Sequence, residues 1–285
     1  MKSVTLFLEE IRIEHTLFAL PFAYVGAVVA ARAFPSWWAL LWITVAVFGA
    51  RTAAMAANRY FDRDMDARNP RTARRALASG ALSPRVMVWA IASGLVLLIL
   101  GAWQLNPLCV KLLPVAALGL LVYPLCKRFT WLVHFVLGAV DALAPLGAFI
   151  AVSGTVTVPA LLLFVAVTVW VAGFDIIYAL MDVGVDRAQG IKSFPAQFGE
   201  RNAAGVPLGL HAIMLLALAA AGVLTRAGWP YVFGILTAAL LIVYEARLLR
   251  AAANVFVLNQ RIFVANMTFS VAFLATTVAA FTLGL

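Results

Sequence analysis

The sequence predicts an all-α integral membrane protein with nine transmembrane helices, arranged as two four-helix halves plus one. Three observations support this fold class. Of the 285 residues, 65% are hydrophobic and only 12% are charged, whereas soluble domains carry about 25% charged residues. Apolar stretches of about 20 residues, the length that crosses a bilayer, follow one another along the chain. Two similar groups of carboxylates lie 120 residues apart, from Asp62 to Asp182 and from Asp66 to Asp186.

The N-terminal half supplies four expected spans. The first stretch, 15–33, follows a segment with too many charges for a cleaved signal peptide. The second, 37–57, ends where the first group of carboxylates begins. The third and fourth, 86–104 and 107–125, each begin at a residue pair that favours a helix start, Ser83-Pro84 and Asn106-Pro107.

The C-terminal half supplies the other five. The fifth stretch, 131–152, is followed by the sixth, 159–181, which runs into the second group of carboxylates. Three further stretches complete the series at 206–224, 229–249 and 263–284. The residues that remain for loops are too few for a separate soluble domain, and no Gly/Ser-rich linker divides the series. We therefore expect a single membrane domain over residues 1–285.

The formal charge of +9, from 21 basic and 12 acidic residues, indicates orientation in the bilayer rather than a nucleic-acid partner. With nine spans, the connections alternate between the two sides of the membrane. Of the 21 basic residues, one side receives only Arg32, Lys111 and Arg226. Cytoplasmic loops of membrane proteins are rich in Lys and Arg. We therefore expect the N-terminus and the long loops on the cytoplasmic side and the C-terminus on the opposite side.

Two rows of polar residues mark the candidate site. On a helix, Asn58, Asp62 and Asp66 share one face, at positions i, i+4 and i+8. The second row consists of Asp175, Tyr178, Asp182 and Asp186. Their offsets of 3, 7 and 11 from the first residue would also place them on one face of a continuous helix. Like charges at this spacing repel one another, so we expect a cation between them. Oxygen ligands without a nearby His or Cys favour Mg²⁺.

Basic residues stand close to both rows in the sequence. Arg holds phosphate oxygens through bidentate hydrogen bonds, and Lys supplies a point charge. Carboxylates that alternate with such residues fit a Mg²⁺-bound diphosphate. The candidates for contact with the diphosphate are Arg71, Lys127, Arg128 and Lys192.

At these residues the sequence resembles the UbiA superfamily of intramembrane prenyltransferases. The first motif of that superfamily, N-D-x-x-D-x-x-x-D, is matched by Asn58, Asp62 and Asp66. Arg59 replaces the usual second-position Asp and so removes one possible metal contact. The second motif, D-x-x-Y-x-x-x-D-x-x-x-D, is matched in full by the row that begins at Asp175. Nine spans in two halves plus one also agree with this superfamily, so the resemblance covers nearly the whole chain.

Shorter segments resemble particular branches of the superfamily. Residues 123–131 and 175–195 are similar to 4-hydroxybenzoate polyprenyltransferases, and residues 49–59 and 69–72 to a bacterial branch that includes enzymes of the futalosine route to menaquinone. Haem O synthases share a first motif much like residues 60–66 but lack the second one. The resemblance therefore implies an enzyme of the bacterial inner membrane that serves ubiquinone or menaquinone biosynthesis.

The resemblance implies Mg²⁺-dependent transfer of a polyisoprenyl chain from its diphosphate to an aromatic acid of the 4-hydroxybenzoate or dihydroxynaphthoate type. The metal would neutralise the leaving diphosphate, and the ring of Tyr178 would stabilise cationic charge. Arg12 and Arg51 are the candidates for the carboxylate of the acceptor, because a charge at membrane depth normally faces a cavity or a partner. The candidate metal ligands are Asn58, Asp62, Asp66, Asp175, Asp182 and Asp186.

Two other functions stay open, namely farnesyl transfer of the haem O synthase type and ion-coupled transport through intramembrane carboxylates. Matched carboxylate rows beside arginines favour the prenyltransferase. For the remaining polar residues of the spans we do not expect a role in the reaction. The three histidines, His15, His134 and His211, lack metal-ligand spacing and are expected to pack or lie at an interface. Asp141 has no assigned role, and Glu245 is expected to pair locally with Arg247 and Arg250.

Overall fold

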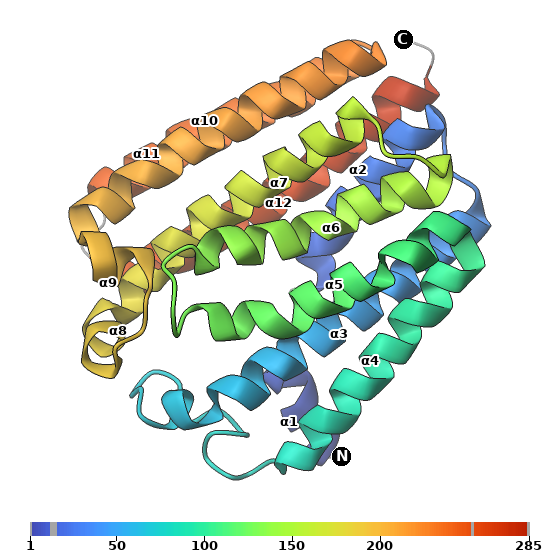
Figure 1. Ribbon diagram of the computed structural model, residues 1–285. Helices are drawn as coiled ribbons and strands as arrows, with labels where there is room; N and C mark the ends of the chain where they lie inside the picture. Colours follow the sequence, from blue (N-terminus) through green and yellow to red (C-terminus); the bar gives the residue numbers. More distant parts are fainter. Residues whose placement is uncertain (1, 12–15, 252–253, 284–285) are drawn as a thin grey trace.

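A computed structural model describes residues 2–11, 16–251 and 254–283, and within these ranges the chain is helical without strands. Long helices lie side by side in a bundle, and short helices and loops gather where α3 and α7 end (Figure 1). The elements are α1 (Lys2–Glu10), α2 (Thr16–Ala31), α3 (Trp37–Ala67), α4 (Pro84–Leu105), α5 (Pro107–Cys126), α6 (Val133–Ser153), α7 (Val158–Tyr178), the 3₁₀ helix η2 (Ala179–Asp182), α8 (Val183–Gln189), α9 (Phe194–Phe198), α10 (Glu200–Thr225), α11 (Pro230–Ala251) and α12 (Val255–Thr282).

Eight helical runs in the described part of the chain are long and apolar enough to cross a membrane. They are α3, α4, α5, α6, α10, α11, α12 and the run Val158–Gln189, which comprises α7, η2 and α8. The ninth expected span corresponds to α2, which the structure describes over 16 residues, Thr16–Ala31. Sixteen residues of helix cover about 24 Å, less than the roughly 30 Å hydrocarbon core. The count of nine spans therefore stays a prediction, while its other eight members are confirmed as apolar helices.

The outer surface of the bundle is apolar. Trp89 on α4, Leu216 on α10 and Val223 near the end of the same helix are among many large side chains that are exposed. Soluble monomers rarely expose extended apolar surface. The protein is therefore a multi-pass membrane protein whose helices present these side chains to lipid.

Helix α3 continues past the expected end of the second span at residue 57 and ends at Ala67. Ser36 caps its start by accepting a hydrogen bond from the Ala39 N–H at 3.2 Å. Its 31 residues are about 46 Å long, more than the roughly 30 Å hydrocarbon core of a bilayer. The first carboxylate row therefore stands on a helical extension of a membrane span.

Helices α3 and α4 approach each other closely through two glycines. A Cβ atom on Gly49 would lie 2.5 Å from the Gly94 carbonyl oxygen, and one on Gly94 would lie 2.6 Å from the Gly49 oxygen. Small residues allow membrane helices to pack backbone against backbone. This contact fixes α3 laterally about two turns before Asn58.

The largest apolar core surrounds α7, to which α2, α6, α10, α11 and α12 contribute. Its centre is the fully buried Trp170, whose ring lies 4.8 Å from that of Phe22 and 5.5 Å from that of Phe269, between centroids. Aromatic pairs at these separations add stability beyond their buried area. Helix α7 is thus held rigidly by the core, and it carries the second carboxylate row at its end.

A polar network inside this core overturns the expectation for Glu245. Its carboxylate is fully buried, lies 2.6 Å from His211 Nδ1, and accepts a hydrogen bond from Asn266 Nδ2 at 2.7 Å. His211 Nε2 donates to the Trp170 carbonyl at 3.1 Å, an approach that only a glycine at position 173 permits. The expected local ion pair is wrong, because Glu245 faces the interior while the arginines of α11 are exposed.

The segment 68–83, between α3 and α4, folds back over the end of α3 beside α1 (Figure 1). Leu77 and Leu82 of this segment are buried in an apolar cluster with Met87 of α4, and Phe7 of α1 packs against it. This cluster holds α1 and the 68–83 segment against the helix that bears the first row.

Candidate active site

A polar chamber with a volume of about 320 Å³ lies between the two carboxylate rows. Its wall consists of parts of α3, α5, α6, α7, α8 and α12 together with the 68–83 segment. Segments that are far apart in the sequence thus meet around one cavity. The predicted site residues in its wall are Arg51, Asn58, Asp62, Asp66, Arg71, Lys127, Asp175, Tyr178, Asp182 and Asp186.

The first row offers two carboxylates, each bonded to a cation from another segment. Lys127 Nζ, at the end of α5, donates to Asp62 Oδ2, and Arg75 Nη1 donates to Asp66 Oδ2 at 2.7 Å. The position of a carboxylate around the axis of α3 determines whether it lines the chamber. The side chain of Asp62 is 4% exposed, whereas that of Asp64 is 80% exposed and pairs with Arg63 outside the chamber.

The second row does not lie on one continuous α-helix, contrary to the sequence expectation. Helix α7 ends at Tyr178, the 3₁₀ helix η2 runs from Ala179 to Asp182, and α8 begins at Val183. A 3₁₀ helix has 3.0 residues per turn instead of 3.6 and therefore changes the direction of the following side chains. Asp182 and Asp186 still line the chamber, but from a broken helix.

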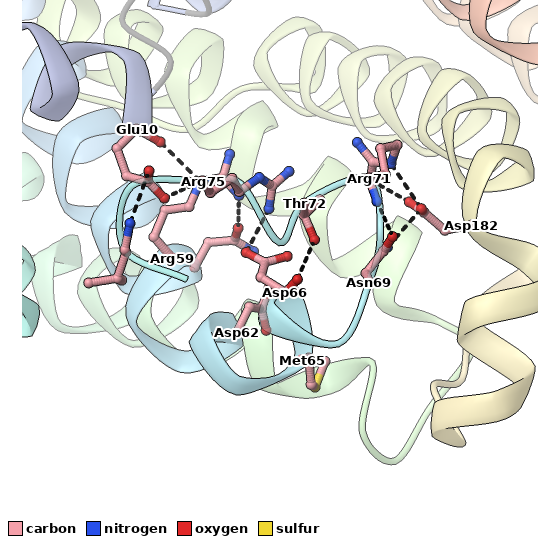
Figure 2. Close-up of polar contacts among 12 residues, drawn as sticks. Glu10, Arg59, Asp62, Met65, Asp66, Asn69, Arg71, Thr72, Arg75 and Asp182 are labelled. Carbon is pink, nitrogen blue, oxygen red and sulfur yellow. Dashed lines mark hydrogen bonds and ion pairs between the residues drawn. The ribbon is translucent and has the colours of Figure 1, made fainter. Parts of the chain in front are cut away.

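Arg71 connects the two rows. Its Nε donates to Asp182 Oδ1 at 2.9 Å and its Nη2 donates to Oδ2, while Asn69 Nδ2 donates to Oδ1 at 2.9 Å (Figure 2). Arg71 and Asn69 belong to the segment that follows the first row, and Asp182 belongs to the second row. A bidentate pair of this kind fixes orientation as well as charge. The segment is thereby closed over the chamber.

The charge of Arg71 is secured by its neighbours. Burial by itself lowers the pKa of this guanidinium, but the hydrogen bonds and charge of Asp182 and the contact with Tyr178 raise it above its ordinary value. The guanidinium carbon lies 5.6 Å from the centre of the Tyr178 ring, within the range of a cation–π interaction. Tyr178 therefore already faces a cation inside the chamber.

Asp175 is held by a histidine that sequence reasoning assigned to packing. His134 Nε2 accepts a hydrogen bond from the Phe194 N–H at 3.0 Å, so the ring proton of a neutral His134 resides on Nδ1. Nδ1 lies 2.6 Å from Asp175 Oδ2 and donates to it. His134 thus orients the first carboxylate of the second row and joins α6, α7 and α9.

Three more residues that sequence reasoning did not place in the site contact its carboxylates. Ser193 Oγ donates to Asp186 Oδ2 at 2.6 Å, and Asn69 and Arg75 make the bonds described above. The only signal for Arg75 was its place in a basic run after the first row. Ser193 and Asn69 stood out only as members of the segments 175–195 and 69–72, which resemble branches of the superfamily. Their contacts were not indicated, because these depend on how loops fold over the chamber.

Arg51 and Asp141 form a pair inside the membrane part of the bundle. Arg51 Nη1 donates to Asp141 Oδ1 at 3.0 Å, and both side chains are largely buried. The pair lines the polar chamber and also a second, mostly apolar cavity of about 320 Å³ among α3, α4, α5 and α6. Asp141, which had no assigned role, is thus the partner of Arg51.

Two of the predicted contacts, Arg128 and Lys192, do not line the chamber. Arg128 is exposed and donates through Nη2 to the Phe61 carbonyl at 2.6 Å. The side chain of Lys192 is exposed outside the chamber, while its backbone N–H donates to the Lys127 carbonyl at 2.7 Å. The sequence neighbours of these two residues, Lys127 and Ser193, line the chamber instead. Arg12 lies outside the described residues, as does His15.

The donor set of the chamber fits Mg²⁺. Its carboxylates are hard oxygen ligands, and Asp62 Oδ1 is buried without a hydrogen-bond partner in the described structure. Within the same described residues, no three acidic, His or Cys side chains converge on one point. Mg²⁺ is usually held by one or two carboxylates, waters and phosphates of a substrate rather than by a cage of protein ligands. The separated carboxylates suit that mode of binding.

Comparisons with known proteins agree with the sequence resemblance. The model of the UbiA prenyltransferase family matches residues 19–267. The 4-hydroxybenzoate octaprenyltransferase of Alkalilimnicola ehrlichii is 34% identical over 231 residues, which cover 79% of this chain and 76% of that protein. The apo structure of a UbiA homologue from Aeropyrum pernix K1 superposes with a TM-score of 0.84 at 33% identity and covers 94% of this chain and 98% of that one.

A further solved structure shares the fold. The UbiA homologue from Archaeoglobus fulgidus bound to GPP and Mg²⁺ has a TM-score of 0.69 at 18% identity, and the match covers 95% of this chain and 99% of that one. At this identity the likeness concerns the architecture alone.

Proposed function

This chain belongs to the UbiA prenyltransferase family and is a polyprenyltransferase of the membrane, and we propose that it transfers a polyisoprenyl chain from its diphosphate to the ring of an aromatic acid. We propose an acceptor of the 4-hydroxybenzoate type, a role in quinone biosynthesis, and a bacterial inner membrane with the chamber on the cytoplasmic side. The single observation that carries the proposal is the meeting of both carboxylate rows, with Arg71 and Lys127, around one chamber.

The diphosphate end of the donor fits between the rows. Asp62 and Asp182 are already balanced by Lys127 and Arg71, and these two cations are placed to exchange a carboxylate oxygen for a phosphate oxygen. When bound, Mg²⁺ supplies positive charge that stabilises the diphosphate as a leaving group. Asp62, Asp66, Asp182 and Asp186 are the residues that would hold it. The relative from Archaeoglobus fulgidus, which binds GPP and Mg²⁺, supports this assignment.

The wall beyond the rows suits an allylic cation. Val171 and Phe174 of α7 and Ile262 of α12 line the chamber on that side, and apolar side chains of this kind exclude water that would hydrolyse the cation. Tyr178 also lines the chamber, and its ring centre lies 5.6 Å from the guanidinium carbon of Arg71. We assign Tyr178 to stabilisation of the cation through its π face.

The acceptor and the isoprenoid chain fit on the membrane side of the rows. Arg51 is the positive group at that depth, although its charge is shared with Asp141 at 3.0 Å. An aromatic carboxylate at Arg51 would hold the ring between the pair and Tyr178. The neighbouring apolar cavity of about 320 Å³ suits hydrocarbon. The relatives named 4-hydroxybenzoate octaprenyltransferase support this class of acceptor.

An acceptor screen tests the proposal. Membranes that contain the protein are incubated with octaprenyl diphosphate, Mg²⁺ and one acceptor at a time, and products are identified by mass spectrometry. The acceptors are 4-hydroxybenzoate, dihydroxynaphthoates and haem. We expect a product with the mass of an aromatic acid plus the prenyl group less one hydrogen, and none from membranes with the Asp182→Ala variant. Prenylation of haem alone, or of no acceptor, would contradict the proposal.

A further inference from the structure

Arg59 stands where the first motif of the superfamily has an aspartate, and the structure shows what this arginine contacts. Its side chain is 8% exposed and lies between α3 and α1 (Figure 2). Nε donates to the Glu10 carbonyl at 2.9 Å and lies 3.7 Å from Glu10 Oε1. Nη1 donates to Asn58 Oδ1 at 3.0 Å. Arg59 therefore joins α1 to the first residue of the carboxylate row.

Glu10 extends this connection to the 68–83 segment. Its side chain is 3% exposed, and Oε2 accepts a hydrogen bond from the Leu77 N–H at 3.4 Å. The same segment carries Arg71 and Arg75, which bond the carboxylates of the chamber. A buried charge needs a partner, and Arg59 and Glu10 supply that partner to each other. The pair thus ties α1, α3 and the segment over the chamber into one unit.

The contact with Arg59 also fixes the orientation of the Asn58 amide. A guanidinium only donates hydrogen bonds, so the atom of Asn58 that faces Arg59 is the oxygen and not the nitrogen. Mg²⁺ binds an oxygen at about 2.1 Å, which would place it within about 5 Å of the guanidinium charge. That repulsion disfavours the amide oxygen as a metal ligand, because it is neutral and is the only oxygen of the side chain. Asp62 and Asp66 also bond a cation through Oδ2, but each is a carboxylate with a second oxygen to offer a metal. The group of Asn58 that remains for a ligand in the chamber is the NH₂, a hydrogen-bond donor.

We propose that Arg59 is a positioning residue that holds the oxygen of Asn58, so that Asn58 donates a hydrogen bond to a phosphate oxygen and does not bind the metal. The first row then presents two metal ligands, Asp62 and Asp66, and one phosphate donor. This assignment replaces the sequence expectation that Asn58 is a metal ligand. It rests on the proposed function, because it concerns the diphosphate and the cation of that reaction.

Binding measurements without turnover test the role of Asn58. The affinity of the purified protein for Mn²⁺, used as a paramagnetic substitute for Mg²⁺, is measured by electron paramagnetic resonance without substrate. The affinity for inorganic pyrophosphate is then measured at saturating Mn²⁺. For Asn58→Ala we expect a Mn²⁺ affinity within twofold of the unaltered protein and a pyrophosphate affinity at least tenfold weaker. Asp62→Ala is the control that loses Mn²⁺. A tenfold loss of Mn²⁺ affinity in Asn58→Ala, or unchanged pyrophosphate affinity, would overturn the proposal.

A double-mutant cycle tests whether Arg59 acts through Asn58. Removal of Arg59 alone leaves Glu10 as an unpaired buried charge, so the variant used is Glu10→Gln with Arg59→Gln, which removes both charges. We expect its pyrophosphate affinity to fall about as far as that of Asn58→Ala, and the triple variant to be no weaker than either, because residues that act as one unit are not additive. Additive losses would show that Arg59 does not act through Asn58.

The same preparations separate this proposal from the proposed function. Prenyl transfer to 4-hydroxybenzoate by the unaltered protein is measured in parallel. Its absence refutes the proposed function. Transfer by the unaltered protein together with a Mn²⁺ affinity that depends on Asn58 refutes only the roles given to Asn58 and Arg59.

Discussion

At the scale of single residues, the chamber is an arrangement of matched charges. Asp62 is bonded to Lys127, Asp66 to Arg75 and Asp182 to Arg71, each across two different segments. Without such partners, repulsion between the carboxylates would oppose the folding of both rows into one cavity. A divalent cation and a diphosphate bring opposite charges in similar proportion, so they can replace these internal pairs without leaving a buried charge uncompensated.

We predict that the carboxylates of both rows are needed for transfer. We expect Asp62→Ala and Asp182→Ala each to reduce the rate of prenyl transfer at least a hundredfold, roughly 2.7 kcal/mol in activation free energy. Each substitution would remove an oxygen ligand of the metal and the carboxylate that positions Lys127 or Arg71. Asp64→Ala is the matched control, since the same substitution there changes an exposed carboxylate two residues away. Radiolabel transfer measures all three. Normal activity in either chamber variant would remove that residue from the site.

Lys127 and Arg128 are neighbours in the sequence but differ in position. Lys127 lines the chamber, whereas Arg128 is exposed and bonds a backbone carbonyl. We expect Lys127→Ala to raise the KM for the prenyl diphosphate at least about tenfold, the effect of roughly 1.4 kcal/mol of lost charge interaction, and Arg128→Ala to leave it within about threefold. Steady-state kinetics with saturating acceptor decide between them. A larger effect for Arg128 would contradict the position given to the diphosphate.

At the scale of elements, the sequence predicted the helix that carries the first row better than the one that carries the second. The i, i+4, i+8 spacing of the first row needs only α3 to stay helical as far as Ala67, and it does. The second row has spacing that suits a continuous helix, but η2 interrupts it between Tyr178 and Asp182. No Pro stands within this break. The change to a 3₁₀ helix accompanies the bonds that Arg71 and Asn69 make to Asp182 from another segment, which local sequence does not reveal.

The contacts of the two described histidines also could not be predicted from local sequence. His134 and Asp175 are 41 residues apart, and His211 and Glu245 are 34 residues apart. Neither pair has a spacing that would indicate contact, because only the packing of α6 on α7 and of α10 on α11 brings them together. Charge and hydropathy predicted the apolar helices and the rows. They named Lys127 only together with Arg128 and Lys192, which do not line the chamber. They did not locate contacts that depend on how helices and loops pack together, and such contacts account for Asn69, His134, Asp141 and Ser193.

The buried network around Glu245 is expected to support the C-terminal half of the bundle. Removal of one partner from a buried pair typically costs about 3–5 kcal/mol, so we expect Glu245→Ala to lower the thermal unfolding midpoint by roughly 6 °C or more. The measurement is thermal denaturation in detergent. Glu200→Ala, which changes an exposed carboxylate at the start of α10, serves as the control. An unchanged midpoint for Glu245→Ala would show that the network contributes little to stability.

At the scale of the whole molecule, composition was enough to identify a bundle of membrane helices. The number of crossings depends on whether α2 is one of them. In the part of the chain that the structure describes, eight helical runs are long and apolar enough to cross, and the described part of α2 is shorter, at 16 residues. Phe22 and Val25 of α2 are nevertheless buried in the largest core, against α7 and α12. A helix in that position follows the direction of its neighbours through the bundle. We therefore keep the expectation of nine crossings, which places the two termini on opposite sides.

Fusions at the C-terminus test this topology. With nine crossings and a cytoplasmic N-terminus, a C-terminal alkaline phosphatase is expected to be active outside the inner membrane, and a C-terminal green fluorescent protein is expected to be dark. Fusions after residue 199, in the loop between α9 and α10, serve as the cytoplasmic reference and should give the opposite pattern. A fluorescent C-terminal fusion would show an even number of crossings and remove α2 from the set of spans.

The most direct measurement of the central claim is the transfer of radiolabelled octaprenyl diphosphate to 4-hydroxybenzoate by the purified protein, with Mg²⁺ and then with excess EDTA. If the two carboxylate rows form one site for a metal-bound diphosphate, the label enters the aromatic acid with Mg²⁺, ceases to do so in EDTA, and returns when Mg²⁺ is restored. Undiminished transfer in excess EDTA would contradict the assignment of the carboxylate rows.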